Sequence, residues 1–155
     1  MRTVAQQGPG PLIIGCGNTD RGDDAAGILL ARRLLQLGLD AREQSGDAAA
    51  LLFAFEESGA CRPVIVADAV VSGARPGTVI AWDAVANPLP KETFRCSTHA
   101  LGVAEAVELA RALGKLPASL TIYGIEGTDF RQGAVPSAAV LAAVEELARR
   151  IQEEG

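Results

Sequence analysis

Residues 12–27 read Leu12-Ile13-Ile14-Gly15-Cys16-Gly17-Asn18-Thr19-Asp20-Arg21-Gly22-Asp23-Asp24-Ala25-Ala26-Gly27. The apolar run at the start of this stretch is too short for a helix, and Gly15 and Gly17 end it because they allow backbone conformations that a β-carbon forbids. From Asp24 to Leu37 apolar residues recur at helical spacing, and Asp23 is the expected N-cap of that helix. The stretch therefore predicts a buried strand, a glycine-rich turn that carries carboxylates, and a long helix.

The turn in this unit does not match the phosphate-binding loops of nucleotide sites. The dinucleotide fingerprint G-x-G-x-x-G needs glycine where Asp20 stands, and the phosphate loop needs a lysine followed by serine or threonine. Asp20, Asp23 and Asp24 would also place negative charge where a pyrophosphate must lie. A turn rich in carboxylates suits a cation or a proton in transit, so a nucleotide-binding module is the least favoured function.

The composition predicts one domain, residues 1–155, in which residues 1–10 form a flexible tail. The net charge is −5 and the lysines and arginines are scattered, so we expect no binding to nucleic acid or to an anionic membrane. The sequence has neither a signal peptide nor a run long enough to span a membrane, so we expect a cytoplasmic protein. Three distant cysteines predict neither a disulfide framework nor a thiolate zinc site.

Strands and helices alternate along the rest of the sequence. Apolar and β-branched runs predict strands, and amphipathic segments predict helices, with caps at Asp47 and Ser137. The loop 127–133 is expected to be mobile. The expected strands are 40–44, 63–68, 77–82 and 118–124, and the expected helices are 48–57, 103–113 and a last one that follows Ser137 and ends near Ile151.

This order of elements predicts an α/β fold with three layers, in which a mostly parallel sheet carries helices on both faces. The connection before 77–82 is too short for a crossover helix, so this strand is expected to be antiparallel and at one edge. Ligands of such sheets bind beyond the carboxyl ends of the strands. That rule selects the turn after Ile14, the strand end at Asp68, and His99 just before its helix.

Asp24, Asp68 and His99 are the candidate site residues, because each lies at an element boundary that the topology could bring to one rim. Two carboxylates and one imidazole suit a divalent ion that keeps open positions for water or substrate. A purely structural explanation exists for each residue. Asp24 could stabilise the first turn of its helix, Asp68 could cap a loop, and His99 could bond to Ser97 or Thr98.

Nucleophilic chemistry has less support in the sequence. Cys16 could pair with His99, but neighbouring carboxylates raise the pKa of a thiol, so Cys16 is favoured as a packing residue. There is no G-x-S-x-G elbow for a serine hydrolase. Asn18 is expected to shape the turn, although its amide could orient a substrate. Asp20 and Asp23 are expected to be solvated or capping.

Six short segments of the sequence share their order with a known family. They are Gly15-Cys16-Gly17-Asn18, Gly22-Asp23-Asp24, Gly27, Val66-Ala67-Asp68-Ala69, Ser97-Thr98-His99-Ala100-Leu101-Gly102 and Tyr123-Gly124-Ile125-Glu126. In that order they resemble the hydrogenase maturation endopeptidases. The resemblance runs from about Leu12 to Ile151, nearly the whole chain. No single motif decides it, but the combination is specific.

The resemblance implies an α/β fold and an endopeptidase that removes a C-terminal extension from the precursor of the large subunit of nickel–iron hydrogenases, after nickel has been inserted. It also implies three residues that bind a metal ion. By position these are Asp24, Asp68 and His99, which would be both the metal ligands and the catalytic residues. Some relatives have glutamate where this chain has Asp24, so its carboxylate would be drawn back by about one methylene.

Nickel would arrive already coordinated by the cysteines of the substrate, so the resemblance implies no organic cofactor and no tightly held metal. The expected partner is the large-subunit precursor, and the protein is expected to be a monomer. Gly15, Gly17 and Asn18 would shape the turn. Gly22 and Gly27 would let the tail of the substrate approach the backbone closely.

Two other functions use the same three residues. A self-sufficient metallopeptidase or amidase would hold its own zinc and cleave ordinary peptides, whereas a non-catalytic metal-binding module of an assembly pathway would cleave nothing. The choice of partner is expected to lie in the loops 70–76, 87–96 and 127–135.

Overall fold

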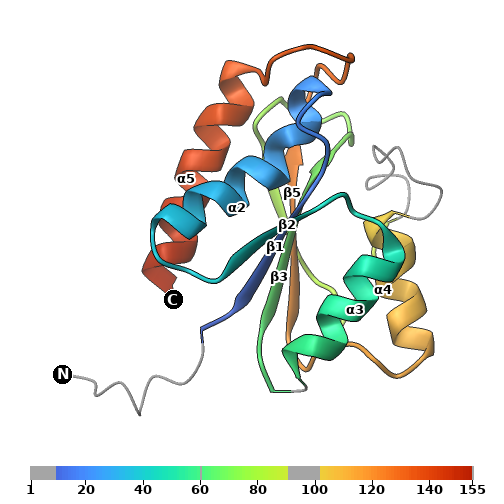
Figure 1. Cartoon of the computed structure of the whole chain (residues 1–155). Helices are drawn as coiled ribbons and strands as arrows, with labels where there is room; N and C mark the ends of the chain where they lie inside the picture. The colour runs from blue at the N-terminus through green and yellow to red at the C-terminus, as the bar shows by residue number, and fades with distance from the viewer. Residues whose placement is uncertain (1–9, 60, 91–101, 155) are drawn as a thin grey trace.

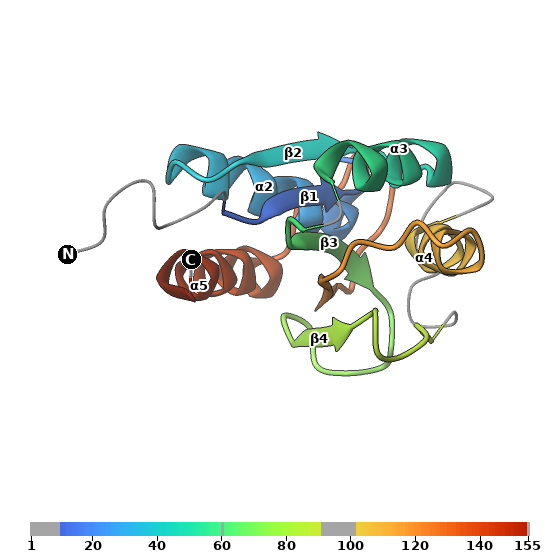
Figure 2. The same ribbon diagram turned by 90° about the horizontal axis from the view of Figure 1, so that it is seen from below.

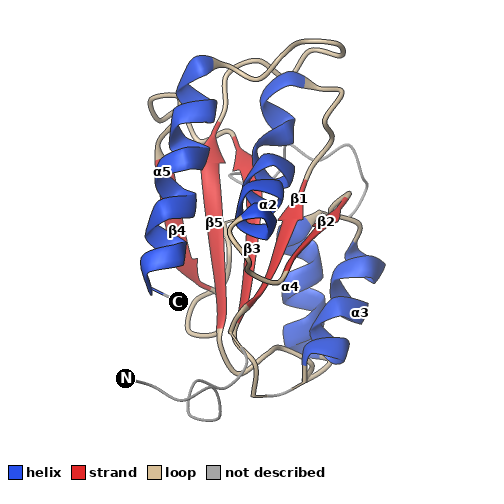
Figure 3. Ribbon diagram, turned by 60° about the vertical axis from the view of Figure 1, so that its left-hand side comes forward, coloured by secondary structure: helices blue, strands red, loops and turns tan. Residues whose placement is uncertain are grey.

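The computed structural model describes residues 10–59, 61–90 and 102–154. In this part of the chain, five strands form one sheet in the order β2-β1-β3-β5-β4, with helices on both faces (Figures 1 and 3). The strands are β1 (Leu12–Cys16), β2 (Ala41–Gln44), β3 (Val64–Val70), β4 (Val79–Asp83) and β5 (Leu120–Glu126). The helices are the 3-10 turn η1 (Gly22–Ala25), α2 (Ala26–Gln36), α3 (Ala48–Ser58), α4 (Val103–Ala112) and α5 (Ala138–Glu154).

The sheet has the predicted mixture of strand directions. Strands β2, β1, β3 and β5 are parallel, and β4 pairs antiparallel with β5 at one edge. The chain between β3 and β4 is too short for a crossover helix, and an antiparallel return is the arrangement that a short connection allows. The α/β fold with three layers is therefore confirmed.

Helices α2 and α5 cover one face of the sheet, and α3 and α4 cover the other (Figures 1 and 2). The alternation of side chains along β1 divides the core between these layers. Ile13 packs with α2 and α5, whereas Leu12 and Ile14 pack with α3 and α4. Both faces of the central strands are thus buried, which explains why their sequences are continuous apolar runs.

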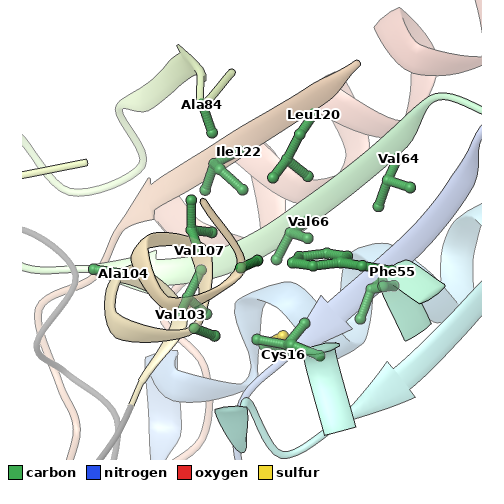
Figure 4. Packing of buried hydrophobic residues seen from close by; sticks show 14 of the residues in the cluster. Cys16, Phe55, Val64, Val66, Ala84, Val103, Ala104, Val107, Leu120 and Ile122 are labelled. Atoms are coloured by element: carbon green, nitrogen blue, oxygen red, sulfur yellow. The ribbon is translucent and has the colours of Figure 1, made fainter. Parts of the chain in front are cut away.

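Among the described residues, the core under α3 and α4 consists of small and branched side chains with the buried ring of Phe55, and the partly buried Trp82 packs against it (Figure 4). Phe55 of α3 and Val107 of α4 pack toward Val66 and Ile122 of the sheet. Cys16 lies in the same cluster and is 1% exposed. This environment agrees with the prediction that Cys16 is a packing residue.

Two predicted boundaries differ from the structure. Strand β3 continues to Val70, so Asp68 lies inside the strand instead of ending it. The helix expected from Asp24 is divided into η1 and α2, and no side chain caps α2. The prediction that Asp23 caps this helix is therefore wrong, because its carboxylate is bonded elsewhere in the chain.

The other predicted caps are present. The side chain of Asp47 accepts a hydrogen bond from Ala50 N at 3.3 Å at the start of α3, and Ser137 Oγ accepts one from Val140 N at 3.3 Å at the start of α5. Helix α5 extends to Glu154, a little beyond the predicted end. No helix within the described residues has the length and apolar content needed to span a membrane.

Candidate active site

The carboxyl ends of β1 and β3 lie side by side in the middle of the sheet. After β1 the chain passes through η1 and α2 to β2 on one side, whereas after β3 it runs to β4 at the opposite edge. Such a divergence of neighbouring connections opens a crevice outside the sheet, which is where α/β proteins bind ligands. The predicted residues Asp24 and Asp68 belong to the segments that border this point.

The turn between β1 and η1 is held by Asn18. Its side-chain oxygen accepts a hydrogen bond from Asp20 N at 2.8 Å, and its backbone N–H donates to Asp24 O at 3.2 Å. These bonds close the turn and tie its start to the residue that carries the first candidate carboxylate. The prediction that Asn18 shapes the turn is confirmed, whereas a contact with substrate stays a prediction.

The glycines of this unit are required by close approach of the chain to itself. A β-carbon on Gly17, where φ is 147°, would lie 2.0 Å from Asp24 O, and one on Gly15 would lie 2.0 Å from Gly27 O. A β-carbon on Gly27 would lie 2.3 Å from the carbonyl oxygen of Ala67. The glycines therefore let α2 sit directly on β1 and β3, which brings the start of the helix to the end of β3.

Asp68 is a buried carboxylate, 3% exposed, near the carboxyl end of β3. Its Oδ1 accepts a hydrogen bond from Ala69 N at 2.9 Å. Burial and, after it, the negative charge of Asp24 raise the pKa of Asp68 well above its usual value, although the bond from Ala69 opposes the shift. The folded protein therefore keeps a proton on Asp68 to a higher pH than the unfolded chain does.

Asp24 approaches Asp68 from η1 and is 2% exposed. Arg21 Nη1 lies 3.4 Å from Asp24 Oδ2, at the outer side of the turn. Two buried carboxylates that influence each other's charge repel one another when both are ionised. A shared proton or a cation relieves this repulsion, so the pair is equipped for either.

The structure brings together two of the three predicted site residues. Asp24 and Asp68 form the pair, and His99 lies outside the described residues. In residues 10–59, 61–90 and 102–154 no group of three or more His, Cys, Asp or Glu side chains could hold a metal ion. The proposed three-residue metal site therefore stays a prediction, with the two carboxylates as its described part.

The thiol of Cys16 is a neighbour of this pair, and it is suppressed as a nucleophile. Burial raises the pKa of Cys16 well above its usual value, and the charges of Asp68 and Asp24 raise it further. The thiolate is thus disfavoured at the place where a cysteine hydrolase would need it. The expected effect of the carboxylates on this thiol is confirmed.

A cavity of about 390 Å³ adjoins the turn on the side of β2. It is lined by polar groups from the turn, from α2 and from the end of β2, and it does not include Asp24 or Asp68. Its lining residues are Gly17, Asn18, Thr19, Ile28, Arg32, Glu43, Gln44 and Ser45. The lining is mainly polar and the pocket is open to solvent.

Two further buried carboxylates border the site. Asp23 is 0% exposed, which contradicts the prediction of a solvated or capping residue. Glu126, at the end of β5, is 2% exposed and accepts hydrogen bonds from Ser72 N and Ser72 Oγ in the loop that follows β3. Glu126 belongs to a segment that carries the family resemblance. The sequence around Asp23 and Glu126 does not show that they are buried and hydrogen-bonded, because their bonding partners lie far away in the sequence.

Known structures resemble this chain over nearly its full length. The solution structure of the endopeptidase HycI from Escherichia coli matches with a TM-score of 0.74 and 21% identity, covering 94% of this chain and 92% of that one. The [NiFe] hydrogenase maturation protease HycI from Thermococcus kodakarensis KOD1 matches with a TM-score of 0.70 and 23% identity, covering 95% and 93%. The maturating endopeptidase HybD from E. coli matches with a TM-score of 0.65 and 25% identity, covering 94% of each chain.

Sequence comparison gives the family. The comparison with curated protein sequences finds no match. The family model HycI, described as hydrogenase maturation protease, matches residues 46–154, which include Asp68 and His99. The strand–turn–helix unit with Asp24 precedes that span, and the structural matches, which cover 94% or so of the chain, must include most of it. Because the family model matches well over half of the sequence, this chain belongs to the hydrogenase maturation protease family and is an endopeptidase of that kind.

Proposed function

We propose that this endopeptidase removes the C-terminal extension from the precursor of a [NiFe] hydrogenase large subunit, and that it does so after nickel has been inserted. The observation that supports this most is the pair of buried carboxylates, Asp24 and Asp68, beside the carboxyl ends of β1 and β3. In a hydrogenase maturation protease, such a pair is suited to meet a cation that the substrate carries.

In this proposal Asp24, Asp68 and His99 contact the nickel of the substrate. Helix α4 begins at Val103, shortly after His99 in the sequence, and packs on the face of the sheet to which the neighbours of Asp68, Val66 and Val70, also belong. Two oxygen ligands and one imidazole leave coordination positions for the cysteines of the substrate. Nickel then both identifies a loaded precursor and places its tail at the site.

The carboxylates also supply proton chemistry for peptide hydrolysis. A carboxylate with a raised pKa is a better general base than an ordinary one, because its affinity for protons lies closer to neutral pH. Asp68 would take a proton from the attacking water through the carboxylate oxygen that does not contact nickel, and would pass that proton to the leaving amine nitrogen as the peptide bond breaks. The water adds to the carbonyl carbon, so the products are a new carboxylate and a free amine.

The polar cavity next to the turn is the proposed path of the substrate's tail. Its lining by Asn18, Gln44 and Ser45 provides donors and acceptors for an extended backbone. A β-carbon on Gly22 or Gly27 would meet a carbonyl oxygen of the chain itself, so these glycines serve the packing of the chain. That the substrate's tail also approaches them is a prediction that the structure does not support.

The decisive experiment uses a purified large-subunit precursor from the same organism, prepared with and without nickel, and reads the products by intact mass. We expect one C-terminal peptide to be lost from the nickel-loaded precursor alone, and no loss with His99→Ala. Cleavage of both forms would contradict the nickel check and favour a self-sufficient peptidase. Cleavage of neither form by folded protein would contradict the proposal.

Metal analysis of the purified enzyme separates the nickel-checking protease from a zinc peptidase. We expect less than one equivalent of tightly held metal, because Asp24, Asp68 and His99 would bind the metal of the substrate. Stoichiometric zinc that survives dialysis against a chelator, together with cleavage of ordinary peptides, would establish the zinc enzyme instead.

A further inference from the structure

The side chain of Asp23 is fully buried, and it accepts several hydrogen bonds within the described part of the chain. All the groups that donate these bonds lie between β5 and α5. Oδ2 accepts hydrogen bonds from Thr128 N at 2.8 Å, Asp129 N at 3.1 Å and Ser137 Oγ at 3.1 Å, and Oδ1 accepts one from Ser137 N at 2.7 Å. One side chain of η1 thus gathers donors from both ends of a loop that lies more than a hundred residues further along the sequence.

The backbone of the turn is fastened to the same loop. Asp23 N donates to Asp129 O at 2.8 Å, Gly22 N donates to Ala134 O at 3.1 Å, and Gly133 N donates to Asp20 O at 2.6 Å. The fit leaves no spare space. A β-carbon on Gly22, where φ is 52°, would lie 2.2 Å from the carbonyl oxygen of Asp129.

These contacts explain how a buried charge is tolerated at this position. Four N–H and O–H donors converge on the carboxylate of Asp23, and Ser137 is also the N-cap of α5. The positive end of the long helix α5 favours a negative charge there. The oxygens of the Asp23 carboxylate therefore bond to the chain itself, and Asp23 has a different role from its neighbour Asp24.

The task follows from the place of Asp23 in the turn. Asp24 is the next residue of η1 and is buried where η1 meets β3, so the bonds that hold Asp23 also determine where Asp24 lies. We propose that Asp23 is the positioning residue of the site: its carboxylate, held by residues 128–137, keeps η1 in place so that Asp24 stays opposite Asp68. This inference rests on the proposed function where cleavage is the readout.

The same contacts change the interpretation of the loop between β5 and α5. The sequence suggested that residues 127–133 form a mobile loop and that residues 127–135 take part in partner choice. The backbone N–H and C=O groups of this loop bond to the turn that carries Asp24, so the structure shows a fastened segment where a mobile one was expected. A part in partner choice stays a prediction.

The test compares wild type with Asp23→Asn, because an asparagine has the same shape but loses the charge and one of the two acceptor oxygens. The first readout is the structure of each protein, in which the variant should show Asp24 displaced from Asp68. An unchanged distance between the two carboxylates would overturn the proposal. This readout needs neither substrate nor metal.

Two solution measurements extend the test. The affinity for Cd²⁺ alone, measured by calorimetry, should fall by about 10- to 100-fold, as is usual when a residue that orients metal ligands is lost. The kcat/KM for cleavage of the nickel-loaded precursor should fall by a similar factor, because a displaced Asp24 no longer meets the nickel that the precursor carries. If wild type cleaves and Asp23→Asn cleaves equally fast, the proposal is wrong and the proposed function stands.

Matched variants separate positioning from loss of stability. Val144→Ala removes an apolar contact between α5 and the sheet without touching the bonds of Asp23. At a temperature where this variant and Asp23→Asn are both folded, Val144→Ala should keep the wild-type kcat/KM. Ser137→Ala removes one donor and should lower kcat/KM in the same direction but less. Ser137→Thr keeps the hydroxyl and should restore it. If no precursor is cleaved by wild type, a displaced Asp24 and weaker Cd²⁺ binding still support the inference while the proposed function fails.

Discussion

The middle of the sheet and its carboxyl edge are built on opposite principles. Within the described residues, the middle of the sheet is lined by buried apolar side chains from β1, β3 and β5. The buried acidic side chains of this part of the chain lie in the carboxyl-terminal halves of β3 and β5 or in η1, the turn that follows β1; they are Asp23, Asp24, Asp68 and Glu126. The first region stabilises the fold because it buries apolar surface, and the second destabilises it because it buries charged groups.

The acidic edge itself contains two kinds of carboxylate. Asp23 and Glu126 each accept several hydrogen bonds from distant loops, so they act as anchors. Within the described residues Asp68 accepts one hydrogen bond, from the backbone of Ala69, and its pKa is raised through burial and through Asp24. Burial of an acid does not by itself identify a reactive group; the number of donors that satisfy it distinguishes an anchor from a candidate for chemistry.

The largest effect is expected in the apolar middle of the sheet. Ile122 of β5 is 0% exposed, and Ile122→Ala should lower the free energy of unfolding by about 2–5 kcal/mol, since it leaves a cavity in the core. Urea unfolding measures the change. Cleavage by the folded variant should stay at the wild-type rate, and a large loss of kcat in folded protein would break the division between the two regions.

Removal of an anchoring carboxylate at the carboxyl edge of the sheet should lower the free energy of unfolding less than Ile122→Ala does. Glu126→Gln removes the charge that accepts the bonds from Ser72, so the free energy of unfolding should fall by about 1.5–3 kcal/mol. The measurement is urea unfolding beside Ser72→Ala, which removes only the hydroxyl donor and should cost less. Equal stability of Glu126→Gln and wild type would remove Glu126 from the class of anchors.

Removal of the Asp68 charge should raise the free energy of unfolding, whereas the two substitutions above should lower it. Because the fold raises its pKa, the folded chain binds more protons than the unfolded chain between the two pKa values, so stability falls as pH rises through this interval. Asp68→Asn removes that loss and should raise the free energy of unfolding by about 1–2 kcal/mol near neutral pH while it abolishes cleavage.

The pH dependence is the control for Asp68. The advantage of Asp68→Asn over wild type should be greater at about pH 8 than at about pH 3, roughly one unit below the usual aspartate pKa, where wild-type Asp68 is largely protonated in both the folded and the unfolded state. Thermal unfolding of both proteins at the two pH values measures this. A variant that is less stable than wild type at high pH would place Asp68 among the anchors.

The smallest effect is expected for Cys16. Its thiol is buried in the apolar cluster with a raised pKa, so Cys16→Ala should cost about 1 kcal/mol of stability and leave the cleavage rate unchanged. Unfolding and cleavage assays on the same preparation measure both. Loss of cleavage in a folded variant would revive the cysteine as a nucleophile.

The sequence was sufficient for the layers of this fold. Apolar runs, together with the caps at Asp47 and Ser137, are local signals, and they predicted the strands and helices with shifts of a few residues. The antiparallel edge strand followed from a short connection. Asp68 was found because the end of a buried strand is a place where ligands bind in this class of fold.

The misassigned residue shows where local reasoning stops. Asp23 and Asp24 are adjacent and chemically alike, and the sequence alone predicted a cap for the first and a ligand for the second. The difference between them is made by Thr128, Asp129 and Ser137, whose position next to η1 depends on the docking of α5 against α2. The role of His99 stays a prediction, because it lies outside the described residues.

The bond between Asp23 and Ser137 has a consequence for how the protein is made. The turn is synthesised early, and the carboxylate of Asp23 lacks its donors until residues 128–137 have been synthesised and α5 has docked. Contacts of such large sequence separation require a long loop to close first. A chain that stops before Ser137 would lack a finished turn, so an enzyme proposed to trim another protein depends, for its own site, on a segment that is made more than a hundred residues after the turn.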